Sequence, residues 1–230
     1  MVARKTPSIP PVWQVWGIVL GITLSVTTLV SQGVYPTFDV QLSRALQSLR
    51  TEQLEPLSQA LYEFGMNPVY PLVALSAAGW LVFNRRYLPS SFVLLAFASR
   101  ALVTVIKEVV ERPRPTAAEI GLIEGASGFS FPSGHVLGTF LLVGAIWFVF
   151  MEWTESRLVR RLLTILASVW VLLMGLQRVY AGAHWTSDVI GGYLWGGLFL
   201  FLLVQLYRLA ESKLRNPNRA MGYEFPPRSS

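Results

Sequence analysis

Cysteine is absent from this chain of 230 residues, and histidine is almost absent. Without cysteine there can be no disulfide framework, no thiolate nucleophile and no cysteine-based zinc site. The only two histidines, His135 and His184, each lie in a short polar segment beside a long apolar one. Charged residues make up only 14% of the chain, so its polar chemistry is concentrated in a few places.

Hydrophobic residues make up 53% of the sequence, a composition far from that of an ordinary soluble domain. The length fits a single domain. A net charge of +6 would also suit a nucleic-acid-binding protein. However, Lys and Arg accumulate in the cytoplasmic loops of membrane proteins, and this explains the charge better. We therefore expect a membrane protein with no nucleic-acid partner.

Six apolar stretches approach the length of about 20 residues that a membrane-spanning helix needs. They are residues 12–34, 68–83, 88–110, 133–151, 158–179 and 184–207, the second being short. The first is longer than a signal-peptide core and has no small-residue cleavage site, which favours a retained anchor. The predicted fold class is an all-α polytopic membrane protein. Its membrane-embedded domain covers residues 12–210, between cytoplasmic tails at 1–11 and 211–230, the second of them flexible.

A polar stretch between the first two spans has leucines at helical spacing. They form two sets around Pro56: Leu42, Leu46 and Leu49, then Leu54, Leu57 and Leu61. This pattern predicts an amphipathic helical segment. We expect one or two interfacial helices lying on the membrane surface; the alternative is a helix packed against the bundle.

Basic residues gather in the loops on one side of the predicted layout. These are Arg4, Lys5, Arg85, Arg86, Arg157, Arg160, Arg161, Arg208, Lys213, Arg215 and Arg219. Because Lys and Arg mark cytoplasmic loops, we expect this side to be cytoplasmic. Three polar segments then fall together on the opposite, non-cytoplasmic face: residues 107–115, 132–135 and 178–188.

The first polar segment (KEVVERPRP) carries Lys107, Arg112 and Arg114 at the end of the third span. Its prolines hold the backbone extended, so the arginines project from a stiff strand. The planar fork of arginine matches phosphate oxygens, and lysine adds a point charge. The alternative is a surface ion pair between Lys107 and Glu111, with both arginines solvated.

The second segment (PSGH) places Ser133, Gly134 and His135 at the start of the fourth span. A helix N-terminus offers unpaired N–H groups and a positive dipole end to an anion. Ser133 would cap the helix or donate to a phosphate, and Gly134 would allow close approach to the backbone. His135 would lie within one turn of the anion. The alternative is an ordinary capped helix with an interfacial histidine.

The third segment (RVYAGAHWTSD) places His184 and Asp188 four residues apart at the head of the sixth span. We expect them on one helix face, with the carboxylate fixing one imidazole nitrogen and leaving the other as nucleophile. Arg178 would reach the same phosphate from the end of the fifth span. Gly192 and Gly196 continue the spacing and favour close helix packing below the site. Although isolated His/Asp pairs are often structural, ionisable clusters at membrane helix ends favour function.

Together the motifs Lys107-x6-Arg114-Pro115, Pro132-Ser133-Gly134-His135 and Arg178-x5-His184-x3-Asp188 resemble the type 2 phosphatidic acid phosphatase family. This family belongs to the lipid phosphate phosphatase and haloperoxidase superfamily. All three motifs occur in order, and the six-span layout is similar to that of the membrane branch. One departure is Gln177, where the family usually has serine; its amide would still donate a hydrogen bond.

The resemblance implies a role for each motif residue. His184 would attack phosphorus to form a phosphohistidine, oriented by Asp188, and His135 would protonate the leaving oxygen and later activate water. The equatorial oxygens would be held by the remaining motif residues: Lys107, Arg114, Ser133, the Gly134 N–H and Arg178. No metal or other cofactor is implied, since cationic side chains would replace the usual magnesium. This agrees with phosphoryl transfer being mainly positioning and charge stabilisation.

The implied substrate is a lipid phosphate or diphosphate in a bacterial plasma (inner) membrane: phosphatidate, phosphatidylglycerophosphate or undecaprenyl diphosphate. Membrane lipids would be the other partners, and the sequence indicates no oligomeric state. The roles of two arginines outside the motifs stay open. Arg112 falls inside a spacer. Arg100 lies seven residues before Lys107 and deeper, which favours a structural partner or a role in supporting the site.

Three other classes of protein fit part of the pattern. The sequence Gly125-Ala126-Ser127-Gly128 resembles the nucleophile motif of rhomboid-type intramembrane serine proteases, but Ser127 falls in a loop. That alternative also leaves the phosphate-binding cations unexplained. A vanadium haloperoxidase shares the pocket but is soluble. A non-catalytic lipid-binding protein on the same fold would not need both histidines and the aspartate.

Overall fold

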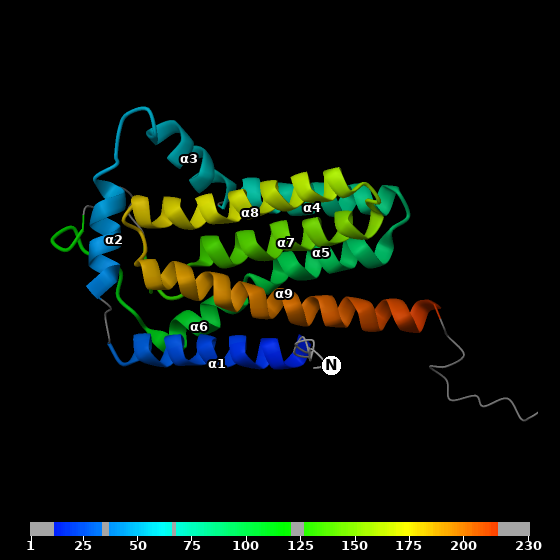
Figure 1. The fold of residues 1–230 in the computed structure, drawn as a ribbon, viewed down its shortest axis with the longest axis horizontal. Helices are drawn as coiled ribbons and strands as arrows, with labels where there is room; N and C mark the ends of the chain where they lie inside the picture. Colours follow the sequence, from blue (N-terminus) through cyan, green and yellow to red (C-terminus); the bar gives the residue numbers. More distant parts are fainter. Residues whose placement is uncertain (1–11, 34–36, 66–67, 121–126, 216–230) are drawn as a thin grey trace, which may run out of the picture.

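The computed structural model describes residues 12–33, 37–65, 68–120 and 127–215 (Figure 1). All regular secondary structure in these ranges is helical, as the sequence predicts. The helices are α1 (Val12–Ser31), α2 (Thr37–Gln47), α3 (Glu55–Phe64), α4 (Val69–Phe83), α5 (Tyr87–Ser99), α6 (Leu102–Val110), α7 (Gly134–Trp153), α8 (Arg157–Tyr180) and α9 (Thr186–Arg215).

Within the described ranges, four helices are long and apolar enough to cross a membrane: α1, α7, α8 and α9. A fifth span is possible if α3 and α4 are taken together, although they meet at a bend of 55°. The all-α membrane fold is therefore confirmed, but the predicted number of six spans is not. At the C-terminus, α9 continues to Arg215, beyond the boundary predicted at residue 210. The tails 1–11 and 216–230 lie outside the described residues.

The predicted third span, residues 88–110, is wrong as a single helix. It is divided into α5 and α6, and the break falls at Arg100 and Ala101. Neither residue is glycine or proline, so no turn signal marks the break. At this point the guanidinium of Arg100 lies over the ring of Tyr70, 4.6 Å from its centroid. The charged side chain of Arg100, in an otherwise apolar stretch, therefore makes a cation–π contact with α4.

Helix α7 forms the centre of the bundle, with α5, α8 and α9 packed against it (Figure 1). Its fully buried side chains include Leu137, Leu141 and Leu142, which belong to the largest apolar cluster. Close packing with α9 depends on glycine, as expected: a Cβ at Gly192 would lie 3.0 Å from the Ser133 carbonyl oxygen. Small residues allow membrane helices to approach in this way. The contact therefore holds the starts of α7 and α9 together.

The polar stretch between the first spans forms α2, which crosses one end of the bundle, and α3, which lies obliquely near that end (Figure 1). Both helices contact the bundle: α2 packs against α8 and α9, and α3 packs against α4 and α8. However, α2 buries Asp39 and Ser43, whereas Leu42 is 45% exposed. The polar face of α2 therefore points inward, while Leu42 stays exposed and Leu46 packs, partly buried, against the apolar cluster of Val136 and Met174.

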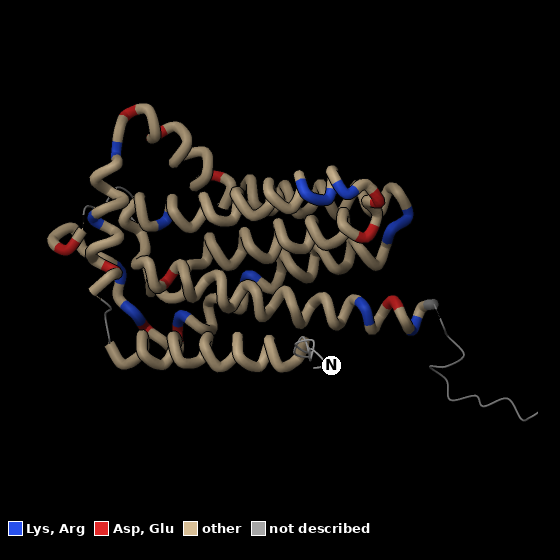
Figure 2. Tube along the Cα trace, viewed as in Figure 1, with Lys and Arg blue, Asp and Glu red and all other residues tan. Residues whose placement is uncertain are grey.

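Charges gather at the two ends of the bundle, and most of the length of the long helices is uncharged (Figure 2). One end has the α4–α5 and α7–α8 connections and the end of α9, with the basic residues Arg85, Arg86, Arg157, Arg160, Arg161, Arg208 and Lys213. The opposite end has the three polar segments predicted to form a site. The arrangement thus separates the basic loops from the candidate site by the length of the bundle.

Candidate active site

The three polar segments meet at one end of the bundle. The end of α6 and the loop after it supply Lys107 and Arg114, and the end of α8 supplies Arg178. The backbone N–H of Ser133, at the start of α7, donates to the carbonyl oxygen of Asp188 at 3.0 Å. The second and third polar segments are therefore joined directly.

His184 and Asp188 are paired, but not along a helix face as expected. His184 lies in the turn before α9, which begins at Thr186. The turn brings His184 Nδ1 to 3.4 Å from Asp188 Oδ2, and the same oxygen accepts a hydrogen bond from the Trp185 backbone N–H at 2.9 Å. With Nδ1–H directed to the carboxylate, Nε2 is left as the nitrogen with a free lone pair.

Arg114 lies beside that nitrogen, with Nη1 3.3 Å from His184 Nε2. Carbonyl oxygens fix the guanidinium: Nη1 donates to Ala183 at 2.7 Å, and Nε donates to Gly128 at 3.0 Å and Ser127 at 3.2 Å. A planar cation with several donors is thus held next to the candidate nucleophile. The carbonyl oxygen of Ser127 therefore helps to hold Arg114. Ser127 belongs to the protease-like motif at residues 125–128, of which residues 125 and 126 lie outside the described ranges.

Lys107 points into the site and not toward Glu111. Its ammonium donates to the carbonyl oxygens of Phe129 and, at 3.3 Å, Ser130. Glu111 is exposed and ends α6 with a left-handed backbone (φ 50°), and no ion pair between it and Lys107 is found in the described ranges. The surface-pair alternative is therefore wrong.

The start of α7 presents unused polar groups. Ser133 is the N-cap residue, yet its hydroxyl caps no backbone N–H; it is buried and has no partner among the described residues. His135 Nε2 is likewise buried and without such a partner. Buried polar atoms are normally hydrogen-bonded, so these two are the groups that a bound anion would satisfy.

Tyr62 of α3 is a site neighbour that the sequence did not indicate. Its ring stacks on His135, with centroids 5.6 Å apart and an interplanar angle of 19°. The guanidinium of Arg178 lies 5.1 Å from the centroid of the same ring. Tyr62 is thus in contact with both His135 and Arg178 and joins α3 to the site. Its place beside Leu61 in an amphipathic helix gave no signal of this role.

Arg112, whose role the sequence left open, lies at the centre of a buried network. Its Nη1 donates to Asp188 Oδ1 at 2.5 Å and to Ser187 Oγ at 2.7 Å, and its Nη2 donates to Asp39 Oδ2 at 2.8 Å. Asp39 also accepts from the Ser187 backbone N–H at 2.7 Å. Both carboxylates are fully buried, and the arginine side chain is 1% exposed. The network ties α2 to the head of α9.

Burial lowers the pKa of His184 well below its usual value of 6.5, and the cations Arg114, Lys107 and Arg178 lower it further. The imidazole is therefore neutral near pH 7, as a nucleophile must be. Asp188, which acts electrostatically on Lys107 and Arg114, is already paired with Arg112. The excess of positive charge suits an anionic ligand.

Gln177, which stands where the resembled family has serine, is used elsewhere. Its side-chain amide donates to Ser58 Oγ on α3 at 3.1 Å, and both residues are buried. The amide does donate a hydrogen bond, as expected, and this bond connects α8 to α3. In the parts of the chain that the structure describes, no three His, Asp or Glu side chains are grouped as metal ligands.

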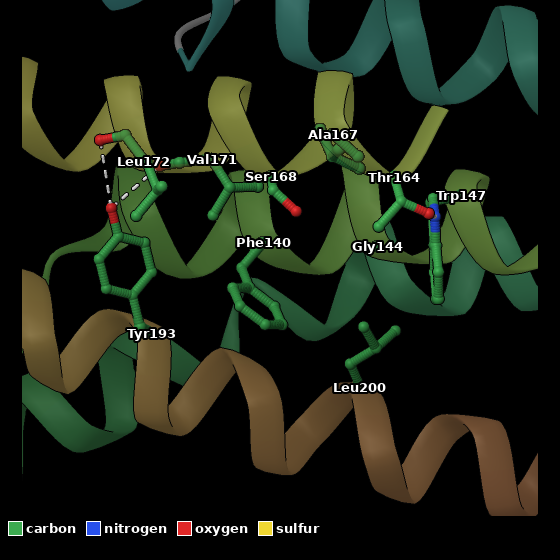
Figure 3. A pocket seen from close by; sticks show the side chains of 11 residues that line it. Phe140, Gly144, Trp147, Thr164, Ala167, Ser168, Val171, Leu172, Tyr193 and Leu200 are labelled. Atoms are coloured by element: carbon green, nitrogen blue, oxygen red, sulfur yellow. Dashed lines mark hydrogen bonds between the residues drawn. The ribbon is translucent and has the colours of Figure 1, made fainter. Parts of the chain in front are cut away.

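Apolar grooves flank α8 along the membrane-facing part of the bundle. The one in Figure 3 has a volume of about 450 Å³ and lies between α7, α8 and α9. Tyr193 borders it, and its hydroxyl donates to the Val171 carbonyl oxygen at 3.0 Å. A second groove of about 450 Å³ extends from Phe64 along α7 and α8. Both have room for hydrocarbon.

Comparison with known proteins identifies the family to which this chain belongs. The PAP2 superfamily model matches residues 89–211. Phosphatidylglycerophosphatase B of Bacillus subtilis is 32% identical over 72% of this chain and 81% of that protein. The undecaprenyl-diphosphatase of Sulfolobus acidocaldarius is 29% identical over 74% of this chain and 78% of that one. The crystal structure of a transmembrane PAP2-type phosphatidylglycerolphosphate phosphatase from Bacillus subtilis superposes with a TM-score of 0.71 at 25% identity, covering 83% of this chain and 94% of that one.

Proposed function

The chain belongs to the PAP2 superfamily of membrane phosphatases, and on that premise we propose that it hydrolyses lipid phosphates through a phosphohistidine at His184. One observation carries the proposal. His184 has Nδ1 directed to the Asp188 carboxylate, and its Nε2 lies 3.3 Å from a fixed guanidinium of Arg114. A nucleophile and a phosphate-binding cation are thus adjacent.

In the first step, the phosphate of the lipid displaces the contact between Arg114 and His184. Its equatorial oxygens are held by Lys107, Arg114, Arg178, the Ser133 hydroxyl and the Gly134 N–H. Nε2 of His184 forms a bond to phosphorus while the bond from phosphorus to the lipid oxygen breaks. The electron pair stays on that oxygen, which takes a proton from His135.

In the second step, a water molecule attacks the phosphohistidine. His135, now neutral, accepts the proton of this water, the bond from phosphorus to Nε2 breaks, and inorganic phosphate leaves. Asp188 holds the same tautomer of His184 throughout. Neither step requires a metal ion or other cofactor, since the side chains that hold the phosphate are themselves cationic.

We place the site on the non-cytoplasmic face of a bacterial plasma membrane. The basic loops lie at the other end of the bundle, and Lys and Arg mark the cytoplasmic side. Relatives are named as phosphatases of phosphatidylglycerophosphate and undecaprenyl diphosphate. Phosphatidate, phosphatidylglycerophosphate and undecaprenyl diphosphate are therefore the substrates to compare. At a helix end, the phosphate lies at headgroup depth while the hydrocarbon stays in the bilayer.

The test uses the purified protein in detergent with EDTA, and phosphate release is measured for each of the three lipids. We expect release from at least one of them, and none from His184→Ala. Acid-quenched wild type incubated with a ³²P-labelled lipid should retain label on the protein, whereas His184→Ala should retain none. Thermal unfolding of the variant establishes that it is folded. Phosphate release by folded His184→Ala would contradict the mechanism.

A further inference from the structure

Arg100 is a cation inside the bundle that the proposed mechanism does not use. It lies at the break between α5 and α6, and its side chain is half-buried. The guanidinium covers the ring of Tyr70 at 4.6 Å, and the Tyr70 hydroxyl donates to the Gly138 carbonyl oxygen at 3.0 Å. The side chain runs so close to α7 that a Cβ on Gly138 would lie 2.8 Å from Arg100 Cδ. Glycine at this position therefore makes room for the arginine.

The donors of Arg100 are unused. Among the residues that the structure describes, none accepts a hydrogen bond from its guanidinium and no carboxylate pairs with it. Arg112, by contrast, binds two carboxylates, and Arg114 binds three carbonyl oxygens. A charged side chain within a membrane helix is costly unless it has a partner or a ligand. One aromatic ring satisfies only the face of the guanidinium, and its N–H edge is left for an anion.

The position of Arg100 relates it to one side of the site. Its neighbour Gly138 follows His135 by three residues, about one turn farther from the site end of the bundle. Arg100 is also one of the cations that act electrostatically on His135. Thr139, on the same face of α7, has a buried hydroxyl without a partner among the described residues. Unused donors thus extend from His135 toward the membrane interior.

This is the side on which the leaving group must lie. In an in-line displacement, the attacking nitrogen of His184 and the leaving oxygen are on opposite sides of phosphorus. His135 faces the leaving oxygen, and the lipid continues from that oxygen into the bilayer. When the leaving group is an alcohol, its oxygen needs the proton of His135. When the leaving group is itself a phosphate, it carries negative charge, and a cation stabilises it.

We propose that Arg100 binds the second phosphate of a lipid diphosphate, the one that remains on the lipid, and so makes this chain prefer diphosphates to monophosphates. The proposal rests on the proposed function. His184 Nε2 bonds to the terminal phosphorus, and the bond from that phosphorus to the bridging oxygen breaks. The electron pair stays on the bridging oxygen, which becomes an oxygen of the lipid monophosphate held by Arg100. Water then releases inorganic phosphate from His184.

The experiment compares farnesyl diphosphate with farnesyl monophosphate, which share a hydrocarbon chain and differ only in the leaving group. The readout is the ratio of their kcat/KM values, in detergent with EDTA. Arg100→Gln should lower this ratio at least about tenfold, since charged hydrogen bonds to phosphate are lost for one substrate only. Arg100→Lys, which keeps the charge, should retain part of the preference for the diphosphate. Arg86→Gln is the matched control, because Arg86 also covers a ring, that of Trp153 at 5.3 Å, but lies at the other end of α5.

An equal loss with both substrates would mean that Arg100 only supports the fold, and the proposal would be overturned. If the wild type hydrolyses neither substrate, nor the three lipids above, the proposed function fails with it. The proposal is also overturned if Arg100→Gln has the same ratio of kcat/KM values for the two substrates as the wild type. Should Arg100→Gln not fold, inhibition of the wild type decides: methylenediphosphonate must inhibit more strongly than methylphosphonate, and equal inhibition would count against a second phosphate site.

Discussion

Arg112 Nη1 lies 2.5 Å from Asp188 Oδ1, on the carboxylate oxygen that His184 does not use. The other nitrogen of the guanidinium is fixed at 2.8 Å by Asp39 of α2. The carboxylate that is paired with the candidate nucleophile is therefore also held through its other oxygen. In this way α2, which has no residue in the three motifs, contributes to holding Asp188 in place.

Replacing Arg112 by Gln should lower kcat about a hundredfold with little change in KM, because His184 loses its fixed orientation but the phosphate-binding cations remain. Breaking a buried ion pair also leaves uncompensated charge, at a cost of about 3–5 kcal/mol. The melting temperature in detergent should therefore fall as well. Phosphate release and thermal unfolding give both quantities.

The matched control for Arg112 is Arg50→Gln. Arg50 pairs with Glu55 at 3.2 Å, but both side chains are 41% exposed. Exposed pairs contribute about 0–1 kcal/mol, so kcat and melting temperature should be close to wild type. Wild-type kcat in Arg112→Gln would show that the network has no part in catalysis. A fall in melting temperature alone would reduce its role to stability.

His135→Gln should affect substrates according to their leaving group. A lipid alkyl phosphate needs a proton on its leaving oxygen, so its hydrolysis should slow by about a hundredfold to ten-thousandfold. An aryl phosphate such as p-nitrophenyl phosphate has a more stable leaving anion and should be affected much less in the formation of the phosphohistidine. Burst-phase kinetics measure that step separately. Equal losses for both substrates would contradict a role as general acid.

The lowered pKa of His184 predicts a neutral ring throughout the physiological range. Since the chain has only two histidines, ¹⁵N-histidine labelling gives two sets of ring signals, and His135→Gln assigns them. The His184 signals should show no titration between pH 8 and about 6.5, the pKa range of an ordinary histidine. Inorganic phosphate should raise the titration midpoint, because it offsets the nearby cations. A midpoint at or above the ordinary value without phosphate would contradict the prediction.

The same pKa shift links pH to stability. Because folding disfavours the charged ring, the unfolded chain binds the proton more readily than the folded chain. The contribution of His184 to stability is therefore complete above its usual pKa of 6.5 and is lost as the pH falls below that value. The melting temperature of the wild type should fall relative to that of His184→Gln as the pH is lowered below about 6. A parallel pH dependence in both proteins would exclude this linkage.

The sequence could indicate the motif residues because each belongs to a local pattern. Ser133 and His135 follow from a helix start, and His184 and Asp188 from their spacing. The structure brings them together, although the turn before α9 replaces the expected helix face. Their assigned roles stay predictions until the variants are measured.

Asp39 and the break at Arg100 could not be predicted for a different reason. The leucines of α2 suggested an apolar buried face, but the face that the structure buries has Asp39 and Ser43. The buried Asp39 is compensated by partners distant in sequence, Arg112 and Ser187. Likewise, Arg100 interrupts an apolar stretch without a turn residue, and its ring partner Tyr70 lies on another helix. Both features depend on long-range contacts that periodicity does not contain.

Gly192→Leu should disturb the candidate active site by separating α9 from α7. A Cβ there would lie 3.0 Å from the Ser133 carbonyl oxygen and 3.0 Å from Val136 Cβ, so a leucine must push α9 away from α7. Overpacking of this kind costs about 1–3 kcal/mol. It would also strain the 3.0 Å hydrogen bond from Ser133 to Asp188, so activity should fall with stability. Gly17→Leu is the matched control, because a Cβ at that position of α1 meets nothing within 4 Å. Equal activity and melting temperature in the two variants would mean that close packing of α7 and α9 does not position the site.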